Sequence, residues 1–389
     1  MSSKINGVLL GIGVFLFVQA TPREAIGDKQ PVPVARIAVL KDIAQVVLTT
    51  HGLYTILDPT TNQTLFQGRE FSKINVRAVT DGIDVDGKIY SYPRLRFIFT
   101  RDVGVEINQK ERKYRGNFDI IKTHEGRLVL VNRLPVEEYI QGVLYHEISH
   151  RWPMEAIKAQ AVAARTYALY QMEVNTQNDF DVTNDIYSQV YGGRTSERYR
   201  TNLAVKRTQG EILVFQGKIL PAYFHATCGG ATENVRELWN HDGLAPLRGV
   251  RCHFCADSPH FHWKKNFRLK DLQDKLNAAG YHLGLIKEIN ILERNRSERI
   301  KNLEIITRDG KTTSISGKDF RNIVGPNNIR STNFEIFMKG YYVDIVGKGW
   351  GHGVGLCQWG ARGLAMKRYS YKGILEYYYP GAAMIKQED

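Results

Sequence analysis

Residues Val143–Tyr170 read VLYHEISHRWPMEAIKAQAVAARTYALY, and this stretch predicts the helix around which the rest of the chain is organised. Pro153 marks the start, because proline is favoured in a helix's first turn, where its missing N–H would be unpaired anyway. Alanine dominates from there on, which gives a high helix propensity. Apolar side chains recur at helical spacing and predict one buried stripe: Ile157, Ala161, Ala164 and Ala168.

Three polar residues in this stretch are candidates for a site. Glu147 lies in an apolar and aromatic setting, and partial burial raises a carboxyl pKa toward the range that suits a general acid. The alternative for Glu147 is a carboxylate at a helix start that interacts with the helix dipole. Gln160 and Arg165 are costly to bury unless they are paired or face a cleft. We therefore expect them either to border a groove or to make fold-stabilising hydrogen bonds.

The composition indicates a globular protein with an anionic partner. The chain has 389 residues, of which 43% are hydrophobic, enough for a large core in one or two domains. A net charge of +13 favours nucleic acid, a membrane surface or an anionic polysaccharide as partner, although a basic surface with no specific partner is the alternative. The basic residues are scattered, with no run of five, so nucleic acid is not expected.

The N-terminus predicts export. Lys4 precedes an uncharged apolar run, Val8 to Val18, and a small-residue cleavage site follows at Val18-Gln19-Ala20. This pattern is typical of a signal peptide over residues 1–20, with a short uncleaved membrane anchor as the alternative. Residues 21–34 are predicted to be a linker. We expect a periplasmic or cell-wall location, with membrane association only if the segment stays uncleaved.

The remaining pattern predicts an α+β fold, with mostly antiparallel strands, a few functional helices and one elongated catalytic unit with a groove. Residues 35–133 form a β-rich region in which short strands alternate with turn residues. Residues 134–385 form the catalytic region, which includes a loop rich in cysteine and histidine at 225–262. Helices are expected at 196–208 and 269–279, and near 372–379.

The cysteine- and histidine-rich loop has the spacing of a metal site. HxxC and CxxC motifs supply four thiolate or imidazole ligands, as in closed, structural zinc sites: His225, Cys228, Cys252 and Cys255. His253, His260 or His262 is an alternative to His225. Two other interpretations stay open in an oxidising compartment, a disulfide from Cys228 to Cys252 or Cys255, and a redox-active CxxC pair. Cys357 is expected to be a small buried thiol that is not a ligand.

A glycine-rich loop follows near the C-terminus. Five glycines occupy nine positions between Gly347 and Gly355, so the backbone is expected to approach something closely there. The spacing does not match a phosphate loop or a dinucleotide fingerprint. We expect His352 and Gln358 to point into a cleft and Trp350 and Trp359 to stack on sugar faces, with a buried glycine turn as the alternative.

At these motifs the chain resembles the stage II sporulation protein D (SpoIID/LytB) family. The resemblance rests on YIQGVLYHEISHRWPMEAIKAQAVAARTYAL, and it extends in order through VPVARIAVL, YRGNFDI, LVLVNRLPVEEYIQGV, IYSQVYGG, AYFHATCGGATENVRELW and GWGHGVGLCQWGARGLA. It covers nearly the whole chain after residue 30. One local departure is Glu147-Ile148-Ser149, where family members often read Glu-Met-Pro.

The resemblance implies a peptidoglycan lytic transglycosylase. Such enzymes cleave the MurNAc–GlcNAc bond of glycan strands stripped of stem peptides and leave 1,6-anhydro ends. The family's catalytic acid falls on Glu147, and its active-site helix places Gln160 and Arg165 as substrate-binding residues. The loops with Gln189, Tyr191, His352 and Gln358 are expected to line the same groove. Some relatives bind zinc near the motif that reads HATCGG here, as a structural ion that the chemistry does not require.

A different function is also implied by the resemblance. Relatives have been described as modifiers of cell-wall amidases, so the alternative is a non-catalytic protein that binds glycan strands and stimulates an amidase. A zinc hydrolase that uses the cysteines is disfavoured, because thiolate-rich sites are usually closed to catalytic water.

Overall fold

A computed structural model describes residues 1, 32–68, 71–107, 109–185, 188–239 and 243–387. The predicted signal peptide (residues 1–20) and most of the predicted linker (21–34) lie outside these described residues, apart from Met1 and 32–34. None of the helices in the described ranges combines the length and the apolar character that a membrane span requires.

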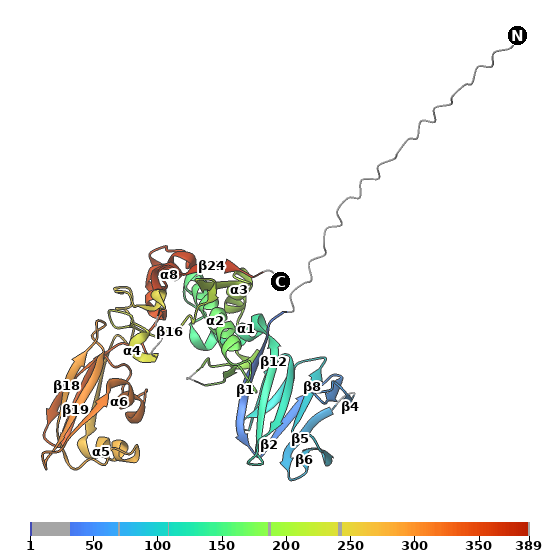
Figure 1. Cartoon of the computed structure of the whole chain (residues 1–389), viewed down its shortest axis with the longest axis horizontal. Helices are drawn as coiled ribbons and strands as arrows, with labels where there is room; N and C mark the ends of the chain where they lie inside the picture. Colours follow the sequence, from blue (N-terminus) through green and yellow to red (C-terminus); the bar gives the residue numbers. More distant parts are fainter. Residues whose placement is uncertain (2–31, 69–70, 108, 186–187, 240–242, 388–389) are drawn as a thin grey trace.

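Two mostly antiparallel sheets, with one parallel pair between β1 and β13, form the N-terminal part and share one apolar core (Figure 1). The larger has the strand order β13-β1-β12-β11-β8-β3-β4, and the smaller β10-β9-β2-β5-β6-β7. The strands are β1 Val34–Ile43, β2 Gln45–Thr50, β3 Tyr54–Leu57, β4 Thr64–Gly68, β5 Phe71–Val79, β6 Gly82–Val85, β7 Lys88–Tyr90, β8 Arg94–Phe99, β9 Val103–Ile107, β10 Lys110–Tyr114, β11 Asn117–Lys122, β12 Leu128–Pro135 and β13 Val182–Thr183. Val46 and Leu48 of β2 point into the core while Gln45 faces solvent, as period-two alternation requires.

The two central helices follow directly from β12. Helix α1 (Val136–Glu147) ends where Ile148 turns to an extended conformation, and α2 (Met154–Val174) begins after Pro153, as the sequence predicted. Helix α2 is buried on nearly all sides, because α1, α3 (Tyr199–Arg207), β14 (Glu211–Phe215), α7 (Gln358–Met366) and α8 (Tyr371–Tyr378) all pack around it. Its many alanines permit this close approach.

The C-terminal part surrounds α2 with a second core. Strand β14 pairs with β15 (Lys218–Ile219) and with β24 (Ala383–Lys386) from the end of the chain. Strand β16 (Phe224–His225) pairs in parallel with β23 (Leu356–Cys357), so segments about 130 residues apart lie side by side. The short helix α4 (Arg236–Trp239) lies between them in the chain.

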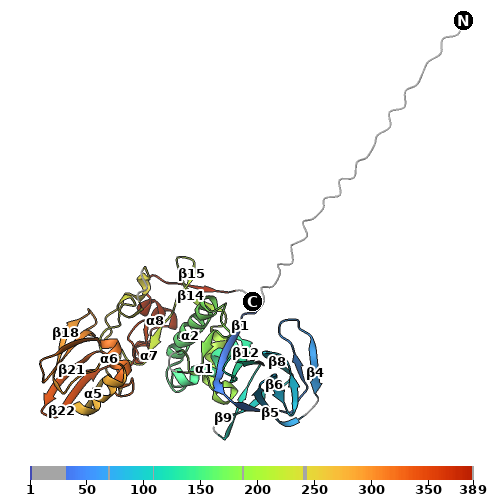
Figure 2. The same ribbon diagram turned by 60° about the horizontal axis from the view of Figure 1, so that its bottom comes forward.

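Residues 262–348 form an insert with its own apolar core, at the opposite end of the molecule from the N-terminal sheets (Figure 2). It has two three-stranded sheets, β17-β22-β21 and β18-β19-β20, together with helices α5 and α6. The bounds are β17 His262–Arg268, α5 Leu269–Ala278, β18 Ile286–Arg294, β19 Ile300–Thr307, β20 Thr312–Ser316, α6 Gly317–Val324, β21 Phe334–Lys339 and β22 Tyr342–Lys348.

The predicted fold class is confirmed, because the chain is α+β with mostly antiparallel pairing. Strands occupy much of residues 35–133, where a β-rich region was expected, and the helix expected at 269–279 is present as α5. The helix expected at 196–208 begins later, after a 3-10 turn, and its N-cap is Arg198. Strand β17 and helix α6 were not predicted, because each has few apolar residues, Trp263 and Phe267 in the strand and Phe320, Ile323 and Val324 in the helix.

Candidate active site

A pocket of about 500 Å³ lies where the end of α1 meets the insert, and we call it the Glu147 pocket. Its walls come from the loop before Tyr191, from β16, from the glycine-rich loop and from helices α4 and α6. The residues that line it are His146, Glu147, Tyr167, Asp185, Ser188, Val190, Tyr223, Phe224, His225, Ala226, Leu238, Trp239, Lys318, Arg321, Asn322, Pro326, Asn327, Thr332, Trp350, Gly351, His352 and Gln358.

Glu147 is the last residue of α1 and lines this pocket. The next residue, Ile148, is buried and leaves the helix, which turns the chain away and holds the carboxyl at the pocket wall. The alternative of a dipole-stabilised carboxylate at a helix start is therefore wrong. At the negative end of a helix dipole, a carboxylate is disfavoured.

Burial raises the pKa of Glu147 to about 7. Two hydrogen bonds to the carboxylate oppose this, one from the backbone N–H of Val190 and one from the Gln358 side chain, whose Nε2 lies 3.4 Å from Glu147 Oε2. Because the desolvation of the charged form outweighs both, the carboxyl group exchanges its proton near neutral pH. A group of this kind can donate a proton and then take one back.

His352 lies in the pocket wall as a neutral imidazole. Its Nε2 donates to the carbonyl of Phe224 (2.9 Å), and its Nδ1 accepts from the backbone N–H of Val354 (3.1 Å). Burial lowers the pKa of His352 to about 3. Both ring nitrogens are thus occupied by the backbone, so His352 shapes the wall and does not offer a free proton donor to a ligand.

Aromatic rings form one side of the pocket. Tyr223 stacks on Trp239 with ring centroids 4.5 Å apart, and Trp239 meets the His352 ring edge-on at 5.1 Å. Tyr223 and Trp239 were not predicted as site residues, although Trp239 ends the quoted family motif AYFHATCGGATENVRELW. Tryptophan and tyrosine faces of this kind suit the apolar faces of sugar rings.

The two tryptophans that were expected to stack on sugars, Trp350 and Trp359, lie in different surroundings. Trp350 lines the pocket, with its ring 5.1 Å from the guanidinium carbon of Arg330. Trp359 lies outside it and packs edge-on against Trp152 at 4.9 Å, under the guanidinium group of Arg362. The expectation that Trp359 stacks on sugar is therefore wrong in this structure, because helix α7 turns its ring toward the start of α2.

Gln160 and Arg165 are also outside the pocket, which corrects their predicted role in substrate binding. Both side chains are fully buried in α2. Arg165 forms a bidentate ion pair with Glu137 (2.7 and 2.8 Å) and donates to the carbonyl of Glu211 (3.1 Å). It thereby joins α1, α2 and β14. Gln160 has no hydrogen-bond partner for its amide among the described residues.

Gln189 and Tyr191 likewise support the pocket from behind and do not line it. The Gln189 side chain accepts from the Tyr139 hydroxyl (3.0 Å) and donates to the carbonyl of Ala164 (3.3 Å). The Tyr191 hydroxyl donates to Asn132 (2.8 Å). These bonds fix the loop whose Val190 N–H reaches Glu147. Of the predicted substrate-binding residues, His352 and Gln358 are the ones that the structure places in the pocket wall.

Tyr167, Asp185 and His146 are among the lining residues that had no predicted role. Tyr167 is the residue through which α2 reaches the pocket, and Asp185 supplies a second carboxylate, 4.0 Å from the ammonium group of Lys41. His146 shares a short hydrogen bond with the Ser196 hydroxyl (2.6 Å).

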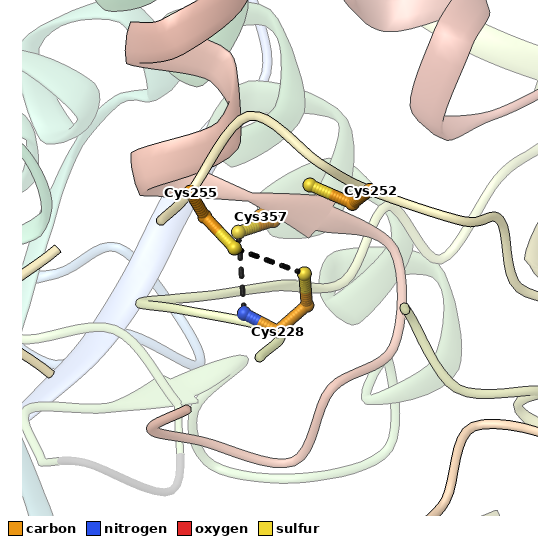
Figure 3. Close-up of side chains that lie close together, drawn as sticks. All are labelled: Cys228, Cys252, Cys255 and Cys357. Carbon is orange, nitrogen blue, oxygen red and sulfur yellow. Dashed lines mark hydrogen bonds between the residues drawn. The ribbon is translucent and has the colours of Figure 1, made fainter. Parts of the chain in front are cut away.

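Four cysteines meet beside the pocket (Figure 3). The sulfur atoms of Cys228, Cys252, Cys255 and Cys357 all lie within 4.8 Å of one another, and all four thiols are free and buried. Cys357 is the buried thiol that was expected, but it occupies the fourth position of the cluster, although it was not expected to be a ligand. The parallel pairing of β16 with β23 brings it there, which spacing in the sequence does not reveal.

His225 is not a member of this cluster, which corrects its predicted role as a ligand. Its Nδ1 lies 3.1 Å from the Val354 carbonyl, and its ring faces His352 in the Glu147 pocket. The two disulfide pairings that the sequence left open are not formed. Cys228 and Cys255 are the pair closest to bonding, with their sulfur atoms 3.4 Å apart.

A buried guanidinium group lies against the cysteine cluster. Arg299 is 1% exposed and donates to the Cys228 carbonyl (2.9 Å), while its Nε and Nη1 have no hydrogen-bond partner among the described residues. A buried cation without matching hydrogen bonds is costly unless negative charge lies near it. Glu233 and the cysteines Cys228, Cys255 and Cys357 supply such charge if the thiols ionise.

The glycine-rich loop makes the close backbone approach that was predicted, but against the protein itself. Gly349 has a positive φ of 81°, and a side chain there would meet the Thr227 carbonyl oxygen at 2.5 Å. Gly353 (φ 92°) lies against the Arg299 guanidinium, which a side chain would meet at 2.4 Å. The glycines therefore let the loop lie on the 225–229 segment and over Arg299.

Fold and site together define a class, an α+β protein in which an acid of raised pKa faces a pocket walled by aromatic rings. Residues 124–215 match the model of the stage II sporulation protein family (SpoIID), and residues 252–355 match a domain of unknown function, DUF8618. The latter range includes the insert.

Curated relatives point to the same family. An uncharacterized protein of Brachyspira hyodysenteriae is 38% identical over 74% of this chain and 76% of its own length. Stage II sporulation protein D of Bacillus amyloliquefaciens is 30% identical over 64% of this chain and 74% of its own length. The amidase enhancer of Bacillus subtilis is 29% identical over 63% of this chain and 40% of its own length. The chain belongs to the stage II sporulation protein D family.

Proposed function

We propose that this protein is a lytic transglycosylase that cleaves the MurNAc–GlcNAc bond of peptide-free peptidoglycan strands. The observation that carries this is Glu147, an acid with a pKa near 7 in a pocket of about 500 Å³. Membership of the family supports a function related to the cell wall. The net charge of +13 suits an anionic wall polymer.

In the proposed reaction Glu147 acts first as an acid and then as a base. Its proton goes to the oxygen of the glycosidic bond, the bond to C1 of MurNAc breaks, and GlcNAc leaves with a new hydroxyl group. Glu147, now a carboxylate, takes the proton of the C6 hydroxyl, and O6 bonds to C1 to close the anhydro ring. No water is consumed, and the acid is regenerated for the next cycle.

One carboxyl group suffices for this sequence, which differs from the paired carboxylates of most glycosidases. The hydrogen bonds from Gln358 and from the Val190 N–H fit the step in which Glu147 is negative, because they favour the carboxylate. Trp239, Tyr223 and Trp350 provide ring faces against which sugars can stack.

The test is the replacement Glu147→Gln in the full chain, incubated with amidase-treated, peptide-free glycan. We expect the release of anhydro-ended products, measured by mass spectrometry, to fall by at least about a hundredfold, as is typical when a general acid is lost. Glu173→Gln, the same change at the exposed end of α2, is the matched control and should leave the rate unchanged. Normal product release by the Glu147→Gln protein would overturn the assignment.

A second candidate function is favoured by one comparison, the relative named an amidase enhancer. In that case the protein binds glycan strands and stimulates a cell-wall amidase without cleaving them. Amidase stimulation that survives Glu147→Gln, with no anhydro products from the parent protein, would support this function over the first. Either function needs the protein to be exported to meet its substrate.

We further propose that the four cysteines hold a structural zinc ion. Four buried sulfur atoms within 4.8 Å of one another fit the closed tetrahedral set that zinc prefers, and this set uses Cys357 in place of His225. Four thiolates around a dication leave a negative charge, which the buried Arg299 beside them would balance. Such an ion would tie the 228, 252–255 and 357 segments together, which positions His352 and Gln358 at the pocket wall.

A further inference from the structure

A second cavity of about 500 Å³ lies on the insert, apart from the Glu147 pocket, and we call it the basic cavity. It is lined by residues from six segments that the fold brings together: Gly229, Gly230, Ala231, Arg251, His253, His262, Arg294, Arg296, Ser297, Glu298, Asn333, Phe334, Glu335, Val346, Gly347 and Lys348. The proposed reaction does not use these residues, and the family resemblance gives no role to the arginines among them.

Positive charge predominates in this cavity. Arg294 is already neutralised, because it pairs with Glu335 (2.6 Å) and donates to the carbonyls of Glu298 and Phe334 (both 2.8 Å). In contrast, the side chains of Arg251, Arg296 and Lys348 make no hydrogen bond or ion pair with any described residue. The carboxylates of Glu298 and Glu335 also line the cavity, but the cations outnumber them, and such an excess on a concave surface focuses a positive potential into it.

The two cavities flank the same pair of chain segments. His225 and Trp350 line the Glu147 pocket, whereas Gly229 and Lys348 line the basic cavity. Between them, Thr227 and Trp350 exchange two backbone hydrogen bonds (3.0 and 2.8 Å). A polymer held at Glu147 would need to extend past this pair of backbone segments to meet the basic cavity.

We propose that the basic cavity binds the lactyl carboxylates of peptide-free glycan, which rests on the function proposed above. When an amidase removes a stem peptide, an uncharged amide at the muramic acid becomes a carboxylate, so every stripped MurNAc gains a negative charge beside the sugar ring. Guanidinium groups bind carboxylates through two parallel hydrogen bonds, and Arg251 and Arg296 are free to do so. The cavity thus selects stripped strands over strands that retain their peptides.

The test measures equilibrium binding of peptide-free glycan to the full chain carrying Glu147→Gln, so that cleavage does not intervene. Adding Arg251→Gln, Arg296→Gln and Lys348→Gln should weaken binding by at least about tenfold and flatten its salt dependence. The matched control adds Arg101→Gln, Lys110→Gln and Lys206→Gln, the same change in charge at exposed residues away from the cavity, and should change the affinity less than about twofold. Thermal unfolding midpoints check that both triple variants fold.

Comparison with two other ligands identifies the chemical group that the cavity binds. Glycan whose carboxyl groups have been reduced to alcohols should bind the parent as weakly as the triple variant binds native glycan. Equal binding of reduced and native glycan, or equal affinity of the triple variant and its parent, would overturn the assignment. Competition by a phosphate polymer for the cavity, combined with no effect of carboxyl reduction, would also overturn the assignment. Failure of the proposed catalytic function can be told apart from failure of this binding proposal. In that case the parent protein would release no anhydro products but would still bind the glycan.

Discussion

Gln358 donates its side-chain amide to Glu147 across 211 positions of the sequence, with 3.4 Å between Nε2 and Oε2. This contact joins the first residue of α7 to the last residue of α1, and both line the pocket. It lowers the pKa of Glu147, while burial raises it to about 7. The pKa of Glu147 therefore depends on the Gln358 hydrogen bond as well as on burial.

Replacing Gln358 by Met should move the pH dependence of cleavage to higher pH. Without the amide, the carboxylate of Glu147 loses a hydrogen bond, so its pKa rises above about 7. The protonated acid needed for the first step then persists at higher pH. The measurement is the rate of anhydro-product release against pH, where the falling limb of the profile should shift upward. An unchanged limb would mean that Gln358 does not act on the acid.

Glu147→Gln should change how stability depends on pH. The folded pKa is raised from 4.5 to about 7, so the folded protein binds the proton more tightly than the unfolded chain does. Relative to Glu147→Gln, the parent should therefore lose stability as pH rises from about 4.5 to about 7, by at most about 3 kcal/mol. Urea unfolding at several pH values measures this. Parallel stability curves for the two proteins would contradict the raised pKa.

Arg165→Met should destabilise the protein without a direct effect on substrate binding. It leaves Glu137 without its bidentate partner inside the helical layer, and breaking a buried pair costs about 3–5 kcal/mol. The folded fraction should keep the parental KM. Lys270→Met, which breaks a surface pair with Asp274, is the control and should cost less than about 1 kcal/mol. A raised KM with unchanged stability would restore a substrate role for Arg165.

Cys357→Ser should lose the metal as completely as Cys228→Ser does, whereas His225→Ala should retain it. The four sulfur atoms lie within 4.8 Å of one another, and the ring of His225 faces the other pocket. Metal analysis of the purified proteins should give about one zinc per chain for the parent and for His225→Ala. Chelation of the parent should lower its thermal midpoint. A metal that survives Cys357→Ser would refute this ligand set.

Trp239→Ala should raise KM for peptide-free glycan, because Trp239 presents a stacked ring to the Glu147 pocket. The loss of one aromatic face is expected to cost about 0.5–1.5 kcal/mol of binding. Trp359→Ala is the matched control, since Trp359 packs on Trp152 outside the pocket. It should lower stability and leave KM unchanged. A raised KM for Trp359→Ala together with an unchanged KM for Trp239→Ala would place the sugars along α7.

Much of the fold could be predicted from the sequence, because buried side chains recur at regular spacing within each helix and strand. Val46 and Leu48 alternate with outward residues, and the alanine-rich run after Pro153 forms the helix it predicts. Glu147 was found for the same reason, as an acid among apolar residues. Strand β17 and helix α6 were missed because each is short and has only two or three apolar side chains.

By itself, the sequence determined much of the strand and helix pattern, the candidate acid Glu147, and three of the four clustered cysteines. Only the tertiary structure decided that Cys357 completes the cluster, that Gln358 reaches Glu147, and that Arg165 is paired with Glu137. Periodicity tells which side chains are buried, but not which distant segment covers them. That depends on the path of the chain, here on the pairing of β16 with β23 and on the elements packed around α2.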